Sequence, residues 1–176
     1  MLIYIVRHGQ TLENLQRLMQ GHMPGTLTDE GRMQMTRVAE YLAKEEIQFR
    51  CIVSSDLKRA MDSSEIIAER LGLAVVSMKI LRERNWGRWT GMTITEAKDR
   101  FGKNGILVFP EGTAEREDEI YKRAKDALTL LKQNYADDAI IVVTHGQFAR
   151  NMIAAYRGCQ YQYIMPLING EIRILY

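Results

Sequence analysis

Cysteine, histidine and proline are scarce in this chain. Its 176 residues include 2 cysteines, 3 histidines and 3 prolines. The two cysteines, Cys51 and Cys159, are too few for a disulfide framework or for an all-cysteine zinc site. Because Cys51 opens an apolar run, we interpret it as a small buried hydrophobic residue rather than as a redox centre.

Long apolar runs and an excess of one charge are also missing. No run reaches the roughly 18 residues that a membrane helix needs, and the first residues lack the basic segment of a signal peptide. The net charge of +2, from 24 basic and 22 acidic residues, is too small for a general nucleic-acid or membrane-surface binder. We therefore expect a cytoplasmic protein with no nucleic-acid or membrane partner. The length predicts one domain over residues 1–176.

Short apolar runs alternate with helical patterns along the chain. The runs predicted to be strands are 2–6, 51–53, 73–78 and 139–144. The helical patterns cover 28–44, 55–71, 93–101, 115–134 and 147–156. Alternation of this kind, with strands that are apolar throughout, predicts an α/β fold with a mostly parallel sheet covered on both faces. The Asn169-Gly170 pair between residues 161–168 and 171–176 predicts a C-terminal antiparallel hairpin.

Two of the three histidines occupy equivalent places in this pattern. Arg7-His8-Gly9 follows the first predicted strand, and His145-Gly146 follows the fourth. Ligands of parallel α/β sheets bind at the carboxyl ends of the strands. If these strands and the strand over 51–53 are neighbours, Arg7, His8, Arg59 and His145 converge on one spot. Two guanidinium groups and two imidazoles, close to helix N-termini, suit a tetrahedral phosphoryl group.

Other interpretations of these residues compete with a phosphate site. Arg7 or Arg59 taken alone is equally consistent with a surface residue beside a loop. A zinc site on His8 and His145 needs a third ligand, and the sequence has no His-Glu-x-x-His or Cys-x-x-Cys spacing to supply one. The glycine-rich signatures of P-loop and dinucleotide-binding proteins are also missing.

Five sequence blocks occur in a familiar order. They are Arg7-His8-Gly9-Gln10-Thr11 with Asn14; Gln20-Gly21 with Leu27-Thr28 and Gly31; Ser54-Ser55 with Leu57 and Arg59-Ala60; Leu81 with Glu83, Gly87, Trp89 and Gly91; and Val143 with His145-Gly146. In these blocks the sequence resembles the histidine phosphatase superfamily, in the branch that contains cofactor-dependent phosphoglycerate mutase. The resemblance covers nearly the whole chain and implies a three-layer α/β/α sandwich.

The resemblance also implies roles for individual residues. His8 would be the nucleophile that carries a phosphoryl group, with Arg7, Arg59 and His145 forming the phosphate pocket. Glu83 would be the general acid. From its local sequence, Arg82-Glu83-Arg84, it would be interpreted as an exposed salt-bridging charge, and the register of Gly87, Trp89 and Gly91 favours the acid. The residues expected to contact substrate are Asn14, Gln20, Gly21, Gly146 and Gln147. No metal and no cofactor are expected, because arginines already neutralise phosphate charge. The expected partner is a small phosphorylated substrate.

The sequence departs from the family pattern at three places. They are Pro24-Gly25-Thr26, Gly112-Thr113-Ala114 and Gln147, and we expect all three near the substrate mouth, where they affect specificity. We interpret His22, also near the mouth, as a surface residue rather than a substrate contact. The charge-dense stretch 111–126 is interpreted as a solvated helix face. The sequence assigns no role to the segment 102–114 and no oligomeric state.

Three functions are compatible with these residues. The leading hypothesis is a phosphomonoesterase that hydrolyses a small phosphorylated metabolite through a phosphohistidine. The alternatives are phosphoryl transfer of the phosphoglycerate mutase type and a non-catalytic phosphate-binding module. Only 53 residues separate Gly91 from His145, which leaves little chain for a lid that excludes water and therefore favours hydrolysis.

Overall fold

The computed structural model describes residues 1–103, 106–107 and 113–176. Its main sheet is built from the strands β1 (Leu2–Arg7), β2 (Phe49–Ser54), β3 (Val75–Ser77), β6 (Ala139–Thr144) and β7 (Ile172–Leu175). Their order in the sheet is β3-β2-β6-β1-β7. The first four lie parallel to one another, and β7 pairs with β1 in the antiparallel direction. The predicted α/β class with a mostly parallel sheet is confirmed.

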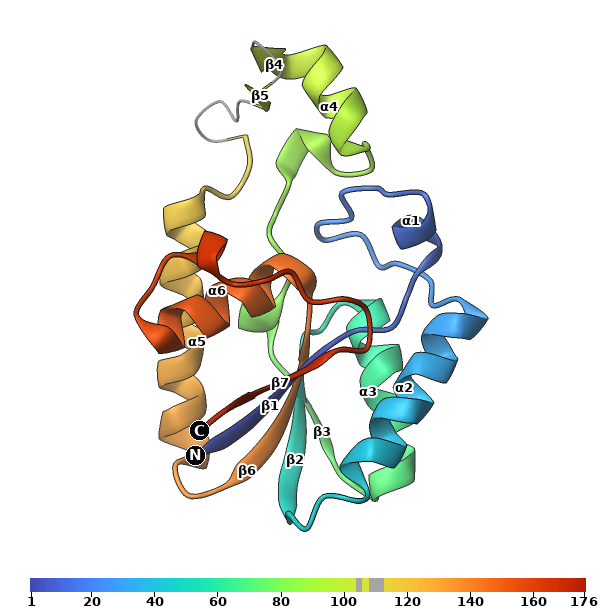
Figure 1. Cartoon of the computed structure of the whole chain (residues 1–176), viewed down its shortest axis with the longest axis vertical. Helices are drawn as coiled ribbons and strands as arrows, with labels where there is room; N and C mark the ends of the chain where they lie inside the picture. Colours follow the sequence, from blue (N-terminus) through green and yellow to red (C-terminus); the bar gives the residue numbers. More distant parts are fainter. Residues whose placement is uncertain (104–105, 108–112) are drawn as a thin grey trace.

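Helices cover both faces of this sheet (Figure 1). On one face lie α5 (Glu117–Tyr135) and α6 (Gly146–Arg157), and on the other lie α2 (Asp29–Leu42) and α3 (Lys58–Leu71). Side chains alternate along each strand, so Ile3 and Ile5 pack toward α5 and α6 whereas Tyr4 and Val6 pack toward α2 and α3. Burial on both faces explains why these strands have no polar alternation in the sequence.

Shorter elements lie beyond the carboxyl ends of the parallel strands. They are α1 (Leu12–Leu15), α4 (Ile94–Phe101), β4 (Gly102–Lys103), β5 (Ile106–Leu107) and the 3₁₀ turns η1 (Lys79–Leu81), η2 (Gly87–Trp89) and η3 (Tyr161–Tyr163). In Figure 1, α4, β4 and β5 form the end of the molecule farthest from the sheet. A small core of their own, with Met19, Trp89 and Ala97 buried together, supports this region.

Two of the helix boundaries follow the signals present in the sequence. Thr28 caps α2, and its hydroxyl accepts a hydrogen bond from the Gly31 N–H at 2.9 Å. Gly72 ends α3 with φ of +67°, a conformation that glycine adopts without steric cost. At the start of α3 the cap residue is Leu57, and the Ser55 hydroxyl, two residues earlier, accepts the Leu57 N–H at 3.3 Å.

The prediction of a C-terminal hairpin is only partly right. The strand expected over 171–176 forms as β7, after a turn in which Gly170 has φ of +75°. Residues 161–168, however, contain η3 and no strand, and β7 pairs with β1 instead. The antiparallel pairing therefore joins residues that are far apart in the chain. The free edge of β1 presents backbone N–H and C=O groups along its whole length, whereas the irregular 161–168 segment presents no such row.

Two expectations about chain type can be compared with the structure. Among the described residues, no helix is both long enough and apolar enough to cross a membrane. Both cysteines are free, and Cys51 is buried in the core beside α5 and α6. Burial raises the pKa of the Cys51 thiol, which disfavours the reactive thiolate and supports the interpretation of Cys51 as a packing residue.

Candidate active site

The sheet brings the two His-Gly pairs and both arginines together. β1 ends at Arg7, β6 precedes His145, and the two strands are neighbours. Arg59 is the second residue of α3, which follows the adjacent strand β2. The ring centroids of His8 and His145 lie 5.2 Å apart, and Arg59 Nε lies 3.2 Å from His8 Nε2. The convergence predicted from the strand order is therefore present.

His8 is buried and held in one orientation. Its Nδ1 lies 2.7 Å from the Gly9 carbonyl oxygen, which can only accept, so Nδ1 carries the proton. Nε2 then has a lone pair, and it accepts from Arg59 Nε. The amide of Asn169 donates to the His8 carbonyl at 2.9 Å. Burial, with the charges of Arg59 and Arg7, lowers the pKa of His8 well below its usual 6.5, so the ring is neutral at neutral pH.

The arginines are charged groups fixed by backbone carbonyls. Arg59 donates through Nη1 to the Met23 carbonyl and through Nη2 to the Gly21 carbonyl. Burial lowers its pKa to about 10, so it still carries a positive charge near pH 7. Arg7 donates from Nη1 to the Leu167 carbonyl at 2.6 Å, and its buried Nε has no hydrogen-bond partner among the described residues. Both guanidinium groups lie at the cavity with His8, and no carboxylate of the described residues is hydrogen-bonded to either of them.

His145 has a different environment from His8. Its Nε2 hydrogen-bonds to the Ser55 hydroxyl at 2.8 Å, and its buried Nδ1 has no partner in the part of the chain that the structure describes. Burial and the nearby Arg59 lower its pKa well below 6.5. A neutral ring fixed behind His8 can become a hydrogen-bond donor when negative charge enters the pocket.

Glu83 reaches the same pocket from an irregular segment after η1. Its carboxylate accepts the N–H groups of Gln147 at 3.2 Å and Phe148 at 3.0 Å, in the first turn of α6, together with the Arg84 N–H at 2.8 Å. These first-turn N–H groups have no partner within the helix, and the positive end of the helix dipole favours an anion there. The structure thus places the carboxyl group beside the histidines, and not on the surface as its local sequence would suggest.

A cavity of about 250 Å³ lies at this junction. The predicted site residues that line it are Arg7, His8, Asn14, Gln20, Arg59, Glu83, Gly146 and Gln147. His145 and Gly21 do not line it. His145 packs behind His8, and the Gly21 carbonyl holds Arg59. Most of the predicted set therefore faces one space, and the other two support it.

Sequence reasoning missed several residues of the pocket. Those that also line the cavity are Leu18, Met19, Trp86, Ile94, Arg150, Pro166 and Leu167. Asn169 was interpreted only as a turn residue, yet its side chain bonds to the His8 carbonyl and to Asn14 Oδ1. The position of Arg150, one turn after Gly146 on the same helix face, is the one signal that was available in the sequence. Of the two tryptophans in this segment, Trp86 lines the cavity, whereas Trp89 is fully buried.

Two glycines of the sequence blocks are required by close backbone approach. A Cβ on Gly9 would lie 2.3 Å from the Gly31 carbonyl oxygen, so the loop after β1 can touch the start of α2 only without a side chain. A Cβ on Gly87 would lie 1.5 Å from the Thr113 carbonyl oxygen, and Gly87 has φ of +53°. These contacts fix the loops that carry His8 and Glu83.

The three departures from the family pattern lie in different places. Gln147 lines the His8 cavity. The Pro24-Gly25-Thr26 stretch reaches the same site through the Pro24 carbonyl, which accepts the backbone N–H of Arg59. Thr113 and Ala114 line a second cavity of about 740 Å³ together with His22. Gly112 and most of the segment 102–114 lie outside the described residues. The expectation that all three departures border one mouth is thus not met by residues 113–114.

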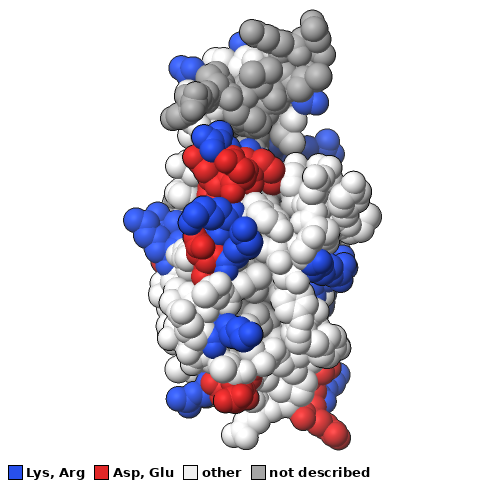
Figure 2. Space-filling view, turned by 90° about the vertical axis from the view of Figure 1, so that its left-hand side faces the viewer, with Lys and Arg blue, Asp and Glu red and all other residues white. Residues whose placement is uncertain are grey.

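His22 is exposed, as expected, and its Nε2 lies 3.0 Å from the Glu83 carbonyl oxygen. The stretch 111–126 is only partly a solvated face. Figure 2 shows basic and acidic side chains interspersed on the side of the molecule that carries α5, and Lys122 pairs there with Asp126 in the open. Glu115 and Arg123, in contrast, are largely buried in an ion pair with side chains 13% and 22% exposed. The interpretation was therefore wrong for these two residues.

The described residues contain no group of three His, Cys, Asp or Glu side chains arranged to hold a metal ion. Three of the four ring nitrogens of His8 and His145 already hydrogen-bond to Gly9, Arg59 and Ser55. Cationic guanidinium groups beside imidazoles suit an anion and repel a metal cation. The donor set of this pocket therefore fits a phosphoryl group and not zinc.

Comparisons with known proteins agree with this geometry. Over residues 3–175 the chain matches the family model of the histidine phosphatase superfamily (branch 1). It is 39% identical over 158 residues to phosphoglycerate mutase-like protein 4 of Arabidopsis thaliana, covering 85% of this chain and 68% of that protein. It is 31% identical over 183 residues to a metal-independent phosphoserine phosphatase of the same plant, covering 99% and 75%.

A solved structure is similar over nearly all of both chains. The mycobacterial glucosyl-3-phosphoglycerate phosphatase in complex with VO3 superposes with a TM-score of 0.87 at 27% sequence identity, covering 99% of this chain and 92% of that one. The match over residues 3–175, the shared fold and the convergent histidines and arginines lead to one conclusion. The chain belongs to the histidine phosphatase superfamily, in its branch 1.

Proposed function

We propose that this protein is a phosphomonoesterase that hydrolyses a small phosphorylated metabolite through a phosphohistidine on His8. The observation that carries the proposal is the orientation of His8. Its Nδ1–H is bound to the Gly9 carbonyl, and its Nε2 lone pair lies beside Arg59 at the cavity. A neutral imidazole with an accessible lone pair is a competent nucleophile toward phosphorus.

In the first step, His8 Nε2 attacks phosphorus and the P–O bond to the alcohol breaks. The leaving oxygen takes a proton from the Glu83 carboxyl group, which is left as a carboxylate. The Arg59 Nε–H, which lies 3.2 Å from Nε2, turns to a phosphoryl oxygen. Arg7 and Arg59 neutralise the charge on the equatorial oxygens, and the neutral ring of His145 adds a hydrogen-bond donor. The Gly9 carbonyl stabilises the positive charge that the ring acquires, through the Nδ1–H bond.

In the second step, a water oxygen attacks phosphorus, the P–Nε2 bond breaks and Glu83 takes a proton from the water. Inorganic phosphate and neutral His8 result. No resident metal is part of this scheme, because guanidinium groups supply the positive charge. A relative named metal-independent phosphoserine phosphatase supports this part of the proposal.

Water is proposed as the main phosphoryl acceptor. The cavity of about 250 Å³ has room for a small monoester and an attacking water, whose share of liquid volume is about 30 Å³. Relatives named as phosphatases, including the phosphoserine and glucosyl-3-phosphoglycerate phosphatases, favour hydrolysis. The mutase alternative requires that the phosphoenzyme be protected from water while the bound substrate changes its orientation.

The test compares the two acceptors directly. The protein is incubated with a panel of phosphomonoesters, and phosphate release is measured beside interconversion of 2- and 3-phosphoglycerate with added bisphosphoglycerate. Phosphate release is expected to dominate, with a transient mass increase of one phosphoryl group on the His8 peptide. Interconversion well above phosphate release would make the mutase reading the correct one, and no phosphorylation of His8 with any donor would indicate a binding module.

A further inference from the structure

Glu83 is held by side chains rather than by a sheet. The stretch from Ile80 to Glu83 belongs to no strand, and its four carbonyl groups need other partners. The Thr144 hydroxyl donates to the Leu81 carbonyl at 2.7 Å. A single side chain, Arg123 of α5, donates to the other three, at Ile80 (2.9 Å), Arg82 (2.7 Å) and Glu83 (3.3 Å).

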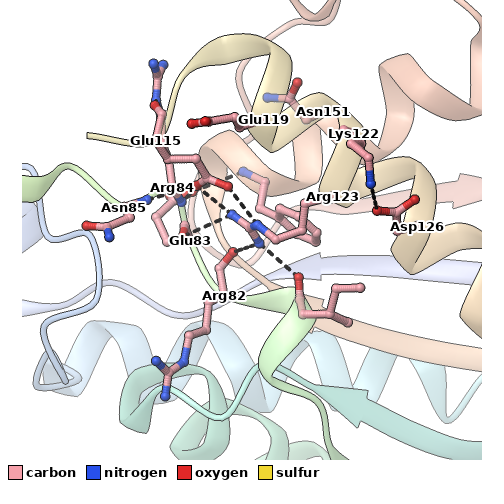
Figure 3. Close-up of polar contacts among 12 residues, drawn as sticks. Arg82, Glu83, Arg84, Asn85, Glu115, Glu119, Lys122, Arg123, Asp126 and Asn151 are labelled. Carbon is pink, nitrogen blue, oxygen red and sulfur yellow. Dashed lines mark hydrogen bonds and ion pairs between the residues drawn. The ribbon is translucent and has the colours of Figure 1, made fainter. Parts of the chain in front are cut away.

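Arg123 uses every donor that its guanidinium group has. Nη1 bonds to two carbonyls, Nη2 bonds to the Glu83 carbonyl and to Glu115 Oε2, and Nε bonds to Glu115 Oε1, the last two at 2.8 Å. A guanidinium carries five N–H groups in a fixed plane. Figure 3 shows this plane inserted between the Glu83 segment and Glu115. A lysine, with three donors on a flexible chain, cannot reproduce such a pattern.

Glu115 holds the chain on the other side of Glu83. Its Oε2 accepts the Asn85 N–H at 3.0 Å, and its own N–H donates to the Asn85 carbonyl at 2.8 Å. Its carbonyl accepts Arg84 Nε at 2.9 Å. The Arg123–Glu115 pair therefore grips the backbone before and after Glu83, although neither residue lines the His8 cavity.

The same guanidinium also supports the far end of the Glu83 side chain. Arg123 lies over the ring of Phe148, 4.3 Å from its centroid. The backbone N–H of Phe148 donates to Glu83 Oε1. One residue of α5 thus contacts both the main chain of Glu83 and the helix turn that receives its carboxyl group.

We propose that Arg123, paired with Glu115, is a positioning residue that sets the reach of the Glu83 carboxyl group toward the leaving oxygen. This inference rests on the proposed role of Glu83 as proton donor. We call the Arg123–Glu115 pair and its bonds to the backbone around Glu83 the clamp. Loss of the clamp should leave the phosphate pocket intact and allow Glu83 to move. Misplacement by about 1 Å at a reacting group can cost on the order of 100-fold in rate.

The test uses a series of phosphomonoesters whose leaving groups differ in acidity. Alkyl phosphates need the proton from Glu83, whereas activated aryl phosphates leave without it. We expect Arg123→Met to lower kcat/KM, which reports the step that expels the alcohol, by roughly 10- to 100-fold for alkyl phosphates and by less than about threefold for an activated aryl phosphate. A plot of log(kcat/KM) against leaving-group pKa should therefore become steeper. Arg123→Lys should lie between Arg123→Met and the wild type.

Lys122→Met is the matched control. Lys122 precedes Arg123 on α5 and also forms an ion pair, with Asp126 at 2.8 Å, but its side chain is 75% exposed and contacts nothing near Glu83 (Figure 3). For Lys122→Met, the slope of the leaving-group plot should equal that of the wild type. As a readout that does not depend on activity, the Phe148 amide of Arg123→Met should exchange with solvent faster, with amides of the β6 core unchanged.

The outcomes separate this inference from the proposed function. If Glu83→Gln steepens the leaving-group plot and Arg123→Met does not, the positioning role is wrong and the role of Glu83 stands. If Glu83→Gln itself leaves the slope unchanged, the proposed acid is wrong. Equal losses for alkyl and aryl substrates in Arg123→Met, with slowed folding or a lowered Tm, would assign Arg123 to general stability and overturn the proposal.

Discussion

The pocket has two halves that are built in different ways. The first half is called the cationic half after the charged Arg7 and Arg59, and it also contains the neutral rings of His8 and His145. It follows strands β1, β2 and β6, whose order and register are set by backbone hydrogen bonds. The acidic half, with Glu83, lies on a stretch that forms no β-sheet hydrogen bonds. The side chains of Arg123 and Glu115 hold this stretch in place. Both halves meet at the N-terminus of α6, where Glu83 accepts the N–H groups of Gln147 and Phe148.

Because of this difference, we expect the cationic half to be rigid and the acidic half to be able to move. Buried strands with both faces covered open only when the whole domain unfolds, so the phosphate-binding half should be rigid. An irregular stretch held mainly by side chains, among them Arg123, Glu115 and Thr144, can change position when one of them is lost. We therefore expect substitutions in the first half to affect all phosphate esters alike, and substitutions in the second half to discriminate among leaving groups.

The largest expected effect lies in the cationic half. His8→Ala should reduce turnover of every phosphate ester by at least about 10⁴-fold, because in the proposed mechanism His8 forms the covalent intermediate. The fold should persist, since the His8 side chain lines the cavity after β1 and belongs to neither hydrophobic core cluster of the sheet. Phosphate release and circular dichroism are measured together. A folded variant with near-normal turnover would rule out the phosphohistidine mechanism.

Glu83→Gln tests the acidic half and should have a smaller, selective effect. The amide keeps the size of the side chain but cannot donate the proton in the same way, so kcat/KM for alkyl phosphates should fall by about 10²–10⁴-fold. For an activated aryl phosphate, kcat/KM should fall by only a few fold, because its alcohol leaves without a proton. Equal losses for both substrates would remove the distinction between the two halves.

Gly87→Ala should loosen the acidic half through its backbone. Positive φ at Gly87 and a Cβ only 1.5 Å from the Thr113 carbonyl oxygen together should cost about 2–4 kcal/mol. Gly72→Ala is the control, because Gly72 also has positive φ but nothing lies within 4 Å of its Cβ, and its cost should be about 1 kcal/mol. Urea unfolding measures both. Similar costs would show that the Thr113 contact relaxes freely.

The cationic half should make stability depend on pH. The pKa values of His8 and His145 are lowered well below 6.5 in the folded chain, first by burial and then by nearby Arg59, so below pH 6.5 the unfolded chain binds more protons. Stability should therefore be unaffected above that pH and fall as the pH drops below it, by up to about 1.4 kcal/mol per pH unit for each histidine. His145→Gln should reduce this slope. An unchanged slope between pH 6.5 and 5 would mean that His145 titrates normally.

No effect is expected from removing divalent metal ions. In the proposed mechanism, the guanidinium groups of Arg7 and Arg59 supply the charge that a metal supplies in other phosphoryl-transfer sites. Addition of EDTA should leave phosphate release within about twofold of the untreated protein. Strong inhibition that one particular ion reverses would show that the cationic half is incomplete without a metal.

Much of the fold could be predicted from local sequence. The apolar runs of β1 and β6, Thr28 before α2 and Gly72 after α3 act over a few residues, through burial on both faces, capping and left-handed backbone. Because parallel strands present their carboxyl ends at one edge, the meeting of His8, Arg59 and His145 also followed from the sequence. The position of Glu83 came from a resemblance in the register of Gly87, Trp89 and Gly91.

The remaining features depended on contacts between residues far apart in the chain. The pairing of β7 with β1, the bond from Asn169 to the His8 carbonyl and the Arg123–Glu115 clamp leave no local pattern. Within the sequence, Arg123 looks like any charge on a solvated helix. Its five acceptors come together only when α5 packs against the sheet and the Glu83 segment. A largely buried guanidinium needs a partner for each N–H group, and the Glu83 segment supplies carbonyl groups that are not bonded to a neighbouring strand.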